Sequence, residues 1–298
     1  MDWTATGLPP PIVTGPMRTF VEARGPPDPS WELVMMGSVY AGAGRGSNGH
    51  GILGGMSSQV RDMFASIARR YDHGNQVLSM GLHHRWRKSA VRLSGATPGN
   101  RVLDCATGTG DLAFEFQRAV GEKGSVIGID FCAEMIEVAR EKASREGLGT
   151  RFEEADALRL PYADRSFDVA SIAFGIRNVD DPARGLEEMA RVVRPGGSVA
   201  VLEFGQPGGP LFGPLYRFYS ASVLPRVGGW LTGERRAYEY LHRTSSAFPS
   251  GTAFLEMMKG TGRFSHVSGR GLTGGIAYVY VGTVGAPVSA TAGGGAAS

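Results

Sequence analysis

Residues 101–111, Arg-Val-Leu-Asp-Cys-Ala-Thr-Gly-Thr-Gly-Asp, form an apolar run that ends in a glycine-rich turn. The run is typical of a buried strand, and Asp130 follows Gly110 by 20 residues. Glycines at a strand-to-helix turn let the backbone approach a ligand closely, and an acidic residue at this distance accepts hydrogen bonds from ribose hydroxyls. The stretch therefore predicts a site for the adenosine half of a cofactor.

Two cofactors fit this turn. Residues 108–113 match the dinucleotide pattern G-x-G-x-x-G/A, but a pyrophosphate would rest on the helix that begins directly after the turn, where Asp111 would repel it. S-adenosylmethionine carries no phosphate and has a cationic sulfonium and ammonium, so an acidic residue at this place suits it. Asp111 is also explained as a simple cap of the helix, and the two roles do not exclude each other.

Beyond the turn, strand-like and helix-like segments alternate along the chain. Helices are expected at 134–146, which Gly147 ends, and at 182–193, which Asp181 and Pro182 begin. Strands are expected at 101–105, 125–130, 151–154, 167–173, 198–204 and 275–281, with a tight turn at 195–197. Such alternation predicts a parallel sheet with helices on both faces, and ligands bind such sheets at the carboxyl ends of the strands. Four residues stand at or just past these ends: Asp104, Asp130, Asp156 and Ala173.

Composition narrows the class of protein. The chain has 298 residues, 42% hydrophobic and 20% charged, which predicts one large folded domain. We expect no membrane-spanning segment, because no apolar run approaches ~20 residues, and no secretory signal, because the first residues lack a basic region followed by an apolar one. A net charge of +3, without a dense run of Lys and Arg, argues against a nucleic-acid partner. Cys105 and Cys132 are the only cysteines, which favours a reducing, cytoplasmic compartment and no metal site.

The two ends of the chain differ from the middle. Residues 1–57 are rich in Gly and Pro and hold no Lys, so we expect a disordered extension. A translation start at Met56 or Met63 would explain the same segment, whereas its acidic residues argue against an organellar transit peptide. The folded domain is expected over 58–284, and the Ala/Gly/Ser-rich residues 285–298 form a flexible tail.

Several short motifs then point to a family. Residues 102–112, 128–131 and 156–161 resemble the class I S-adenosylmethionine-dependent methyltransferases. Ala-Phe-Gly-Ile-Arg-Asn-Val at 173–179, Arg-Pro-Gly-Gly at 194–197 and Leu-Glu-Phe at 202–204 are similar to the quinone C-methyltransferases that act late in menaquinone and ubiquinone synthesis, the UbiE/MenG type. The resemblance implies an α/β fold, a class I Rossmann-like sheet of seven mostly parallel strands with helices on both faces. It makes residues 58–284 the methyltransferase domain.

The resemblance also implies which residues hold S-adenosylmethionine. Gly108, Thr109 and Gly110 would line its methionine portion, and Asp130 would accept hydrogen bonds from the ribose diol. Asp156 and Ala157 would lie at the adenine, and Ala173, where some members have Ser, would touch the cofactor. One departure from the family stands at 260–264, Gly-Thr-Gly-Arg-Phe, just before the sixth strand.

The implied reaction moves a methyl group to a ring carbon of a reduced prenylated quinone, demethylmenaquinol first and the benzoquinol precursor of ubiquinone as the alternative. A base near neutral pKa is wanted for the ring hydroxyl, and His83 fits by residue type, while Tyr71 or Asp72 could act through water. Arg177, which stays charged, would stabilise the quinolate oxygen together with Asn178. The plainer alternatives are that His83 is a core histidine and that Tyr71 ends an apolar helix stripe.

An aromatic-rich insert at 211–230 follows the fifth strand. It could wall a channel for the prenyl tail, touch a bilayer surface, or pack as an ordinary lid helix. Peripheral membrane contact and a homodimer are both compatible with the sequence, and neither follows from it.

Three other functions compete with this one. Amino and nucleic-acid methyltransferases usually place Asn/Asp-Pro-Pro-aromatic after the fourth strand, where this chain has Ala-Phe-Gly-Ile at 173–176. An NAD-dependent oxidoreductase is argued against by Asp111. A non-catalytic scaffold for quinone-synthesis enzymes is disfavoured by the intact motif residues Thr109, Asp130, Arg177 and Asn178.

Overall fold

The computed structural model describes residues 81–286 except 209, 211, 233 and 234, together with residues 60–62, 64–66, 68, 72, 76 and 79. The predicted extension at 1–57 and most of the predicted tail lie outside the described residues, as does the candidate Tyr71.

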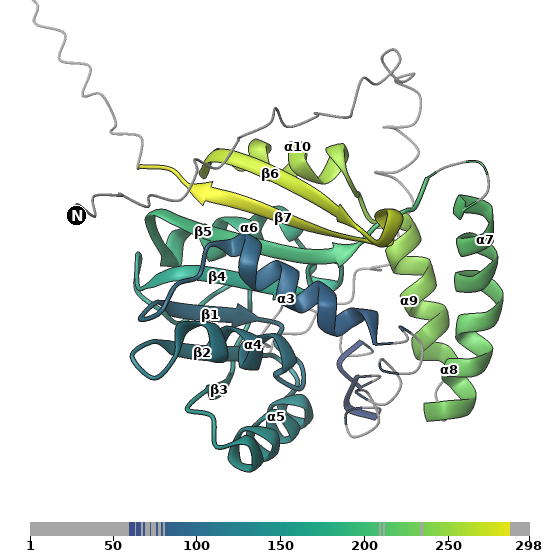
Figure 1. The fold of residues 1–298 in the computed structure, drawn as a ribbon, viewed down its shortest axis with the longest axis horizontal. Coiled ribbons are helices and arrows are strands. Elements are labelled where there is room, and N and C mark those ends of the chain that lie inside the picture. Colours follow the sequence, from purple (N-terminus) through teal and green to yellow (C-terminus); the bar gives the residue numbers. More distant parts are fainter. Residues whose placement is uncertain are drawn as a thin grey trace, which may run out of the picture. The chain divides into compact units, whose positions relative to one another are not determined.

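Seven strands form a single sheet in the order β3-β2-β1-β4-β5-β7-β6. Strands β1 to β5 run parallel, β7 runs antiparallel to β5, and β6 pairs with β7 at the edge (Figure 1). Their bounds are β1 Arg101–Cys105, β2 Ser125–Asp130, β3 Arg151–Glu154, β4 Phe167–Ala173, β5 Val193–Phe204, β6 Phe264–Leu272 and β7 Ala277–Val284. The predicted class, a mostly parallel seven-stranded sheet of the class I methyltransferase type, is confirmed.

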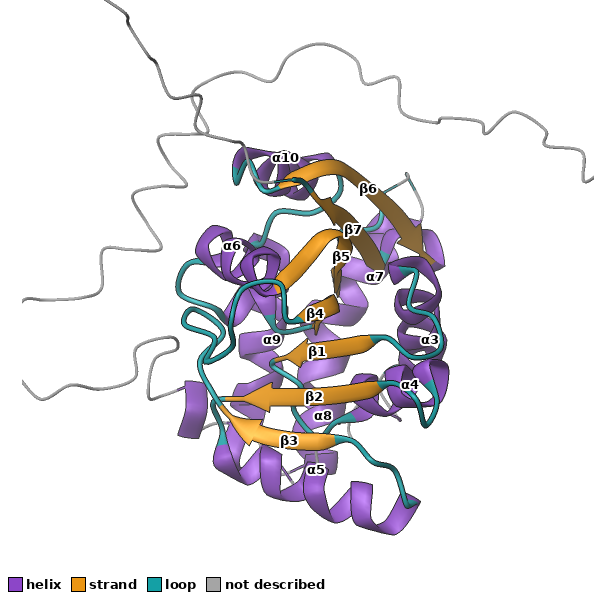
Figure 2. Cartoon of the chain, turned by 90° about the vertical axis from the view of Figure 1, so that its left-hand side faces the viewer, coloured by secondary structure: helices purple, strands orange, loops and turns teal. Residues whose placement is uncertain are grey.

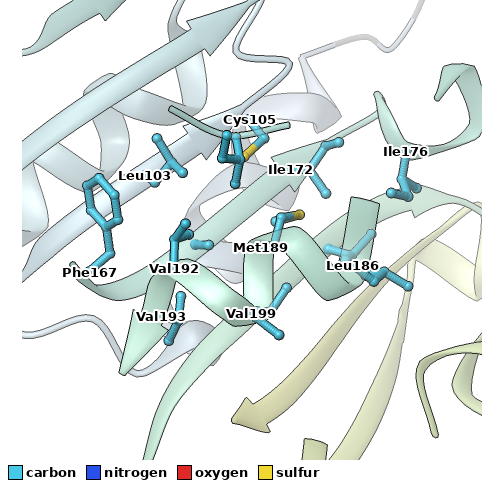
Figure 3. Close-up of a cluster of buried hydrophobic side chains, with 14 of the residues drawn as sticks. Leu103, Cys105, Phe167, Ile172, Ile176, Leu186, Met189, Val192, Val193 and Val199 are labelled. Carbon is cyan, nitrogen blue, oxygen red and sulfur yellow. The ribbon is translucent and has the colours of Figure 1, made fainter. Parts of the chain in front are cut away.

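Helices cover both faces of the sheet (Figure 2). They are α3 Leu82–Ser94, α4 Asp111–Val120, α5 Ala133–Glu146, α6 Pro182–Val192, α7 Phe212–Phe218, α8 Leu224–Thr232, α9 Arg235–Ala247 and α10 Thr252–Gly260. Side chains alternate between the faces along a strand, which divides the core in two. Leu103 and Cys105 of β1 pack with Leu186 and Met189 of α6 (Figure 3), and their neighbour Val102 belongs to the other cluster, with α3, α4 and α5.

The predicted bounds of β1, β2, β3 and β4 coincide with the observed ones. The fifth strand begins earlier than predicted, at Val193, because residues 195–197 form an irregularity inside the strand and not a turn before it. Phe167 pairs with Val193 and Val169 with Ser198, so β5 carries extra residues that bulge out of the ladder. Gly196, with a φ of 78°, allows the backbone to fold there.

Because β1, β2, β4 and β5 are parallel, their carboxyl ends lie together on one side of the sheet, which is called the carboxyl edge below. Helices α7, α8 and α9 lie beyond the ends of β4 and β5 (Figure 1). The polar residues predicted for the site therefore converge on this edge. In the part of the chain that the structure describes, no helix is both long enough and apolar enough to span a bilayer.

Candidate active site

The turn after β1 depends on two glycines in the left-handed region. Gly108 has a φ of 56° and Gly110 a φ of 87°. A Cβ on Gly110 would lie 2.7 Å from Cζ of Phe152, whereas a Cβ on Gly108 would meet no atom within 4 Å. Gly110 therefore seats the turn against β3, and the backbone beside Gly108 stays open to a ligand.

Asp130, the last residue of β2, holds this turn from the next strand. Its Oδ2 accepts a hydrogen bond from the backbone N–H of Gly108 (2.8 Å), and its Oδ1 accepts one from the N–H of Cys132 (3.0 Å). Burial raises the pKa of Asp130 to about 6, although the N–H donors oppose the shift. Each carboxylate oxygen can accept more than one hydrogen bond, so the residue still fits a ribose diol.

Asp104 is a second buried carboxylate at this edge, to which the sequence motifs assign no role. Its Oδ1 accepts a hydrogen bond from Ser171 Oγ (2.6 Å) and its Oδ2 one from Thr107 Oγ1 (2.7 Å). Burial raises its pKa to about 6 against these hydroxyls. Asp104 thus ties β1 to β4 and to the glycine turn, which keeps the ends of the two strands in register.

Thr109 and Asp111 belong to a network of charges that the sequence pattern does not reveal. Thr109 Oγ1 donates to Asp72 Oδ1 (2.6 Å), and Lys142 Nζ binds Asp72 Oδ2 (2.7 Å) and also Asp111. Arg87 Nη1 lies 2.9 Å from Asp111 Oδ2. Burial alone would raise the pKa of Asp111, but Arg87 and Lys142 outweigh it and hold that pKa below its usual range.

This network changes the interpretation of Asp111. The N-cap of α4 is Gly110, and Asp111 is the first residue of the helix, so the hypothesis that Asp111 is the cap is wrong. Its charge is also balanced by two cations, which weakens the argument that it would repel a pyrophosphate. The choice of cofactor therefore cannot rest on Asp111.

The adenine-side candidates follow the next strands. Asp156, two residues past β3, accepts a hydrogen bond at Oδ1 from the backbone N–H of Leu158 (2.8 Å), which fixes its carboxylate. Ala157 is half-buried against the core, and Ala173 is the half-buried last residue of β4. All three stand at the carboxyl edge, as expected, and their contact with a cofactor stays a prediction.

Arg177 and Asn178 lie in a 3₁₀ turn, Ile176–Asn178, directly after β4. Arg177 Nη1 is 2.8 Å from Glu203 Oε1 of β5, and the guanidinium stands 5.4 Å from the centre of the Phe204 ring. The carbonyl of Phe174 accepts a second bond from Nη1. Asn178 Oδ1 accepts a hydrogen bond from the Tyr240 hydroxyl of α9 (3.1 Å), which joins the α7–α9 segment to the site.

The backbone before this turn is strained. Phe174 has a φ of 54°, a region that bulky residues rarely occupy, and its N–H donates to the carbonyl of Leu202 (2.7 Å). Gly175 admits no side chain, because its Cβ would lie 2.7 Å from Cβ of Ala106 in the loop after β1. Strain of this kind persists where surrounding contacts impose it, and it often accompanies a functional site.

His83 does not have the near-neutral pKa that its residue type suggests. It is buried in α3, with Nδ1 hydrogen-bonded to Ser79 Oγ. Burial first, and then the charge of Arg87, lowers its pKa to about 4. His83 is therefore uncharged at neutral pH and is a weaker base than expected. Tyr71 lies outside the described residues, so its role stays a prediction.

Four residues at the site have no counterpart among the predicted functional residues: Arg87, Lys142, Glu203 and Tyr240. Glu203 stands in the Leu-Glu-Phe motif, and a charged residue inside a buried strand was the available sign of its importance. The other three come from helices far along the chain, so no local pattern connects them to the turn.

Two relatives are similar over most of their length. The ubiquinone/menaquinone biosynthesis C-methyltransferase UbiE of Bdellovibrio bacteriovorus is 59% identical over 225 residues, 76% of this chain and 95% of the relative. The demethylmenaquinone methyltransferase of Deinococcus radiodurans is 47% identical over 223 residues, 75% and 91% of the two chains.

A solved structure shares the fold. A SAM-dependent methyltransferase of Thermotoga maritima, named as a possible histamine N-methyltransferase, has a TM-score of 0.54 and 21% identity, and the match covers 74% of this chain and 98% of that one. The model of one family matches residues 54–284, which include the whole sheet and every described candidate residue. The chain belongs to the ubiE/COQ5 methyltransferase family.

Proposed function

We propose that this protein transfers a methyl group from S-adenosylmethionine to a ring carbon of a reduced prenylated quinone. Demethylmenaquinol is the preferred substrate, and the benzoquinol precursor of ubiquinone is the alternative. The observation that carries the proposal is the family match over 54–284, supported by a relative at 59% identity whose name gives both quinone pathways. The methyltransferase domain spans residues 58–284.

The cofactor supplies an electrophilic methyl group on its sulfonium. Gly108, Thr109 and Gly110 receive its methionine end, where the open backbone at Gly108 leaves room. Asp130 accepts hydrogen bonds from the ribose hydroxyls with the lone pairs that its two backbone bonds leave. Asp156 and Ala157 receive the adenine, and Ala173 also contacts the cofactor.

Arg177 and Asn178 act on the quinol. A ring carbon becomes nucleophilic when the neighbouring hydroxyl loses its proton, and a fixed cation stabilises the negative charge that develops on that oxygen. Arg177 is held by Glu203 and by the carbonyl of Phe174, and Asn178 by Tyr240, so both are fixed before the substrate binds. Alignment of the ring carbon with the methyl group contributes the rest.

The direct test is methyl transfer from labelled S-adenosylmethionine to chemically reduced demethylmenaquinone and to the reduced benzoquinone precursor, with both oxidised quinones as controls. Label in the reduced naphthoquinone alone establishes the preferred substrate. Label in both reduced rings assigns the enzyme to two pathways. Label in neither, in a protein that binds the cofactor, would refute the quinone assignment.

Asp130→Asn should weaken cofactor binding at least ~10-fold, because the ribose hydroxyls lose a charged acceptor. Since burial raises the pKa of Asp130 to about 6, protonation at lower pH should have a similar effect in the unchanged protein. We expect its affinity by calorimetry to fall about tenfold between about pH 7.5 and about pH 5. The Asn variant should lose most of this dependence. A variant that kept the full dependence would assign the titration to another group, such as Asp104.

We also infer that the α7–α8 segment rests on a membrane surface that contains anionic lipid. Among the described residues, the large apolar side chains that are exposed all lie in this segment: Leu215 (65%), Phe218 (63%), Val227 (37%) and Trp230 (85%). Exposed apolar residues gathered in one place are typical of an interaction surface. Residues 205–233 hold Arg217 and Arg226 and no acidic residue, so the segment is basic as well as apolar. A prenylated substrate resides in a bilayer, and apolar side chains beside arginines suit its anionic surface.

The double variant Phe218→Ser/Trp230→Ser should lower the binding of the protein to vesicles of mixed neutral and anionic lipid by about tenfold or more, because two exposed apolar side chains no longer enter the lipid. Co-sedimentation at low and high salt measures the effect. The control is Lys123→Ser, which changes an exposed residue between α4 and β2, outside this segment. If the unchanged protein fails to bind vesicles and light scattering shows a dimer that the double variant lacks, the patch joins two copies of the chain and the membrane inference is wrong.

A further inference from the structure

Glu203 is a buried carboxylate for which the proposed mechanism has so far no chemical role. It is 1% exposed, next to the carboxyl end of β5. Its Oε1 accepts two hydrogen bonds, from Arg177 Nη1 (2.8 Å) and from the backbone N–H of Phe204 (2.8 Å), and the backbone N–H of Arg177 also stabilises the carboxylate. The other oxygen, Oε2, is buried without a hydrogen bond, and it is the only carboxylate oxygen of which that holds among the described residues.

The partner of Glu203 is incompletely bonded in the same way. Arg177 uses Nη1 for both Glu203 and the carbonyl of Phe174, and its Nε is buried without an acceptor. A pair whose purpose is only structural would gain from the two-pronged arrangement, in which two N–H groups meet both carboxylate oxygens. In this pair, Arg177 Nε and Glu203 Oε2 take no part in that arrangement. Burying a donor and an acceptor without hydrogen bonds costs free energy.

A free N–H donor together with a free carboxylate oxygen is complementary to a hydroxyl group. A hydroxyl accepts a hydrogen bond at its oxygen and donates one through its hydrogen. The pair lies beside Asn178, at the edge of the sheet where the quinol is proposed to bind, and α9 covers this edge through the bond between Tyr240 and Asn178. The ring hydroxyl of the quinol is such a group, and the proposed reaction places it at this site.

The other candidate bases suit the task less well. His83 is uncharged at neutral pH because its pKa is lowered to about 4. Both oxygens of Asp104 already accept hydrogen bonds from hydroxyl groups, those of Ser171 and Thr107. Arg177 remains a cation and cannot accept a proton.

We infer that Glu203 is the catalytic base: its Oε2 accepts the proton of the quinol hydroxyl, while Arg177 binds the oxygen that this proton leaves. The inference rests on the proposed function and adds the residue that carries the proton. Burial, which raises the pKa of Glu203, makes its carboxylate a stronger proton acceptor than an exposed glutamate.

Protons and electrons balance in the proposed methyl transfer. The hydroxyl proton moves to Glu203, and the ring carbon next to the resulting oxyanion forms a bond to the methyl carbon as the carbon–sulfur bond breaks and leaves its electron pair on sulfur. The methylated carbon then loses its own hydrogen as a proton to water, and the ring oxygen regains a proton from Glu203. The products are a methylated quinol, a neutral thioether and one released proton, with Glu203 again ionised.

The test compares Glu203→Gln with the unchanged protein on two quinols, the natural one and a halogenated analogue with a more acidic hydroxyl. We expect the variant to lose about 100-fold or more in kcat on the natural quinol, the size of a general-base contribution, with its Kd for the cofactor unchanged. On the acidic quinol, which ionises without a base, the loss should shrink at least tenfold. A residue that only positions Arg177 would show the same loss on both quinols.

Two further variants complete this comparison: one is a control, and the other replaces Glu203→Gln if that variant does not fold. Asp168→Asn breaks a more exposed ion pair, Arg194 Nε to Asp168 Oδ1 (2.6 Å), near the other end of β4, and should leave kcat within about threefold. If Glu203→Gln does not fold, Glu203→Asp keeps a carboxylate and is measured on the same two quinols. An unchanged kcat, or an equal loss on both quinols, overturns the inference. A native protein that methylates no quinol instead refutes the proposed function, and the base assignment with it.

Discussion

Arg177→Met should lower kcat by roughly 10²–10³, the usual effect of removing a donor that stabilises a developing oxyanion. Arg177 is the cation fixed directly after β4, between Glu203 and the carbonyl of Phe174. KM should change far less than kcat, because the quinol binds as a neutral molecule and the charge on its ring oxygen develops only after binding, when the hydroxyl proton is lost. Steady-state methyl transfer to the reduced quinone measures both quantities.

The same substitution should destabilise the protein. The side chains of Arg177 and Glu203 are 5% and 1% exposed, so removing the cation leaves an unpaired carboxylate in the interior. Breaking a buried pair in this way costs about 3–5 kcal/mol. Denaturant unfolding measures this cost, and kcat must be taken under conditions where the variant is folded.

Two further variants separate charge from geometry. Arg177→Lys keeps the charge but loses the planar group, and should recover part of the stability with little of the activity. Arg194→Met, which breaks the half-exposed pair with Asp168, should cost less than about 1 kcal/mol and leave kcat nearly unchanged. A folded Arg177→Met protein with kcat within fivefold of the native value would contradict the assigned role.

Gly110→Ala should abolish cofactor binding and strongly destabilise the fold. Gly110 has a φ of 87°, which costs an alanine roughly 1–2 kcal/mol, and the added Cβ would lie 2.7 Å from Phe152. Overpacking of this kind costs about 1–3 kcal/mol, so the total is roughly 2–5 kcal/mol. Because Phe152 also packs edge-on against Phe114 of α4, the ring cannot yield freely and the turn must move.

Gly108→Ala is the matched control for this prediction. It has the same left-handed backbone, with a φ of 56°, but its Cβ would meet nothing within 4 Å. Its effect on the free energy of unfolding should therefore be limited to the backbone strain, about 1–2 kcal/mol. Denaturant unfolding and calorimetry with the cofactor compare the two variants. Equal destabilisation by both would show that Phe152 yields and that the close approach is unimportant.

Strands β1, β2 and β4, in the interior of the sheet, could be predicted to the residue, because they are apolar, largely buried and bounded by turn residues. The edge strand β6 has no such pattern: most of its residues are exposed and two of them, Gly269 and Gly271, are glycines. Only the family resemblance implied a sixth strand there. Helix α3 was not predicted, because its buried positions include the polar residues His83 and Arg87 and so do not form a purely apolar stripe.

The sequence by itself determined the parallel sheet, the glycine turn and the placement of acidic residues at the strand ends. These features follow from local rules, because the spacing of apolar residues, the turn residues and the helix caps each depend on only a few neighbouring residues. The family motifs added the cofactor and the class of reaction.

Only the tertiary structure decided which charges meet. Asp111 is bound by Arg87 from α3 and Lys142 from α5, Glu203 withholds one oxygen from Arg177, and Asn178 is held by Tyr240 of α9. Burial among these groups lowers the pKa of His83 and raises that of Glu203, which reverses the order of the candidate bases that residue type alone suggests. Packing brings together side chains that are distant in sequence, and the electrostatics of the site depend on those distances and on the exclusion of water.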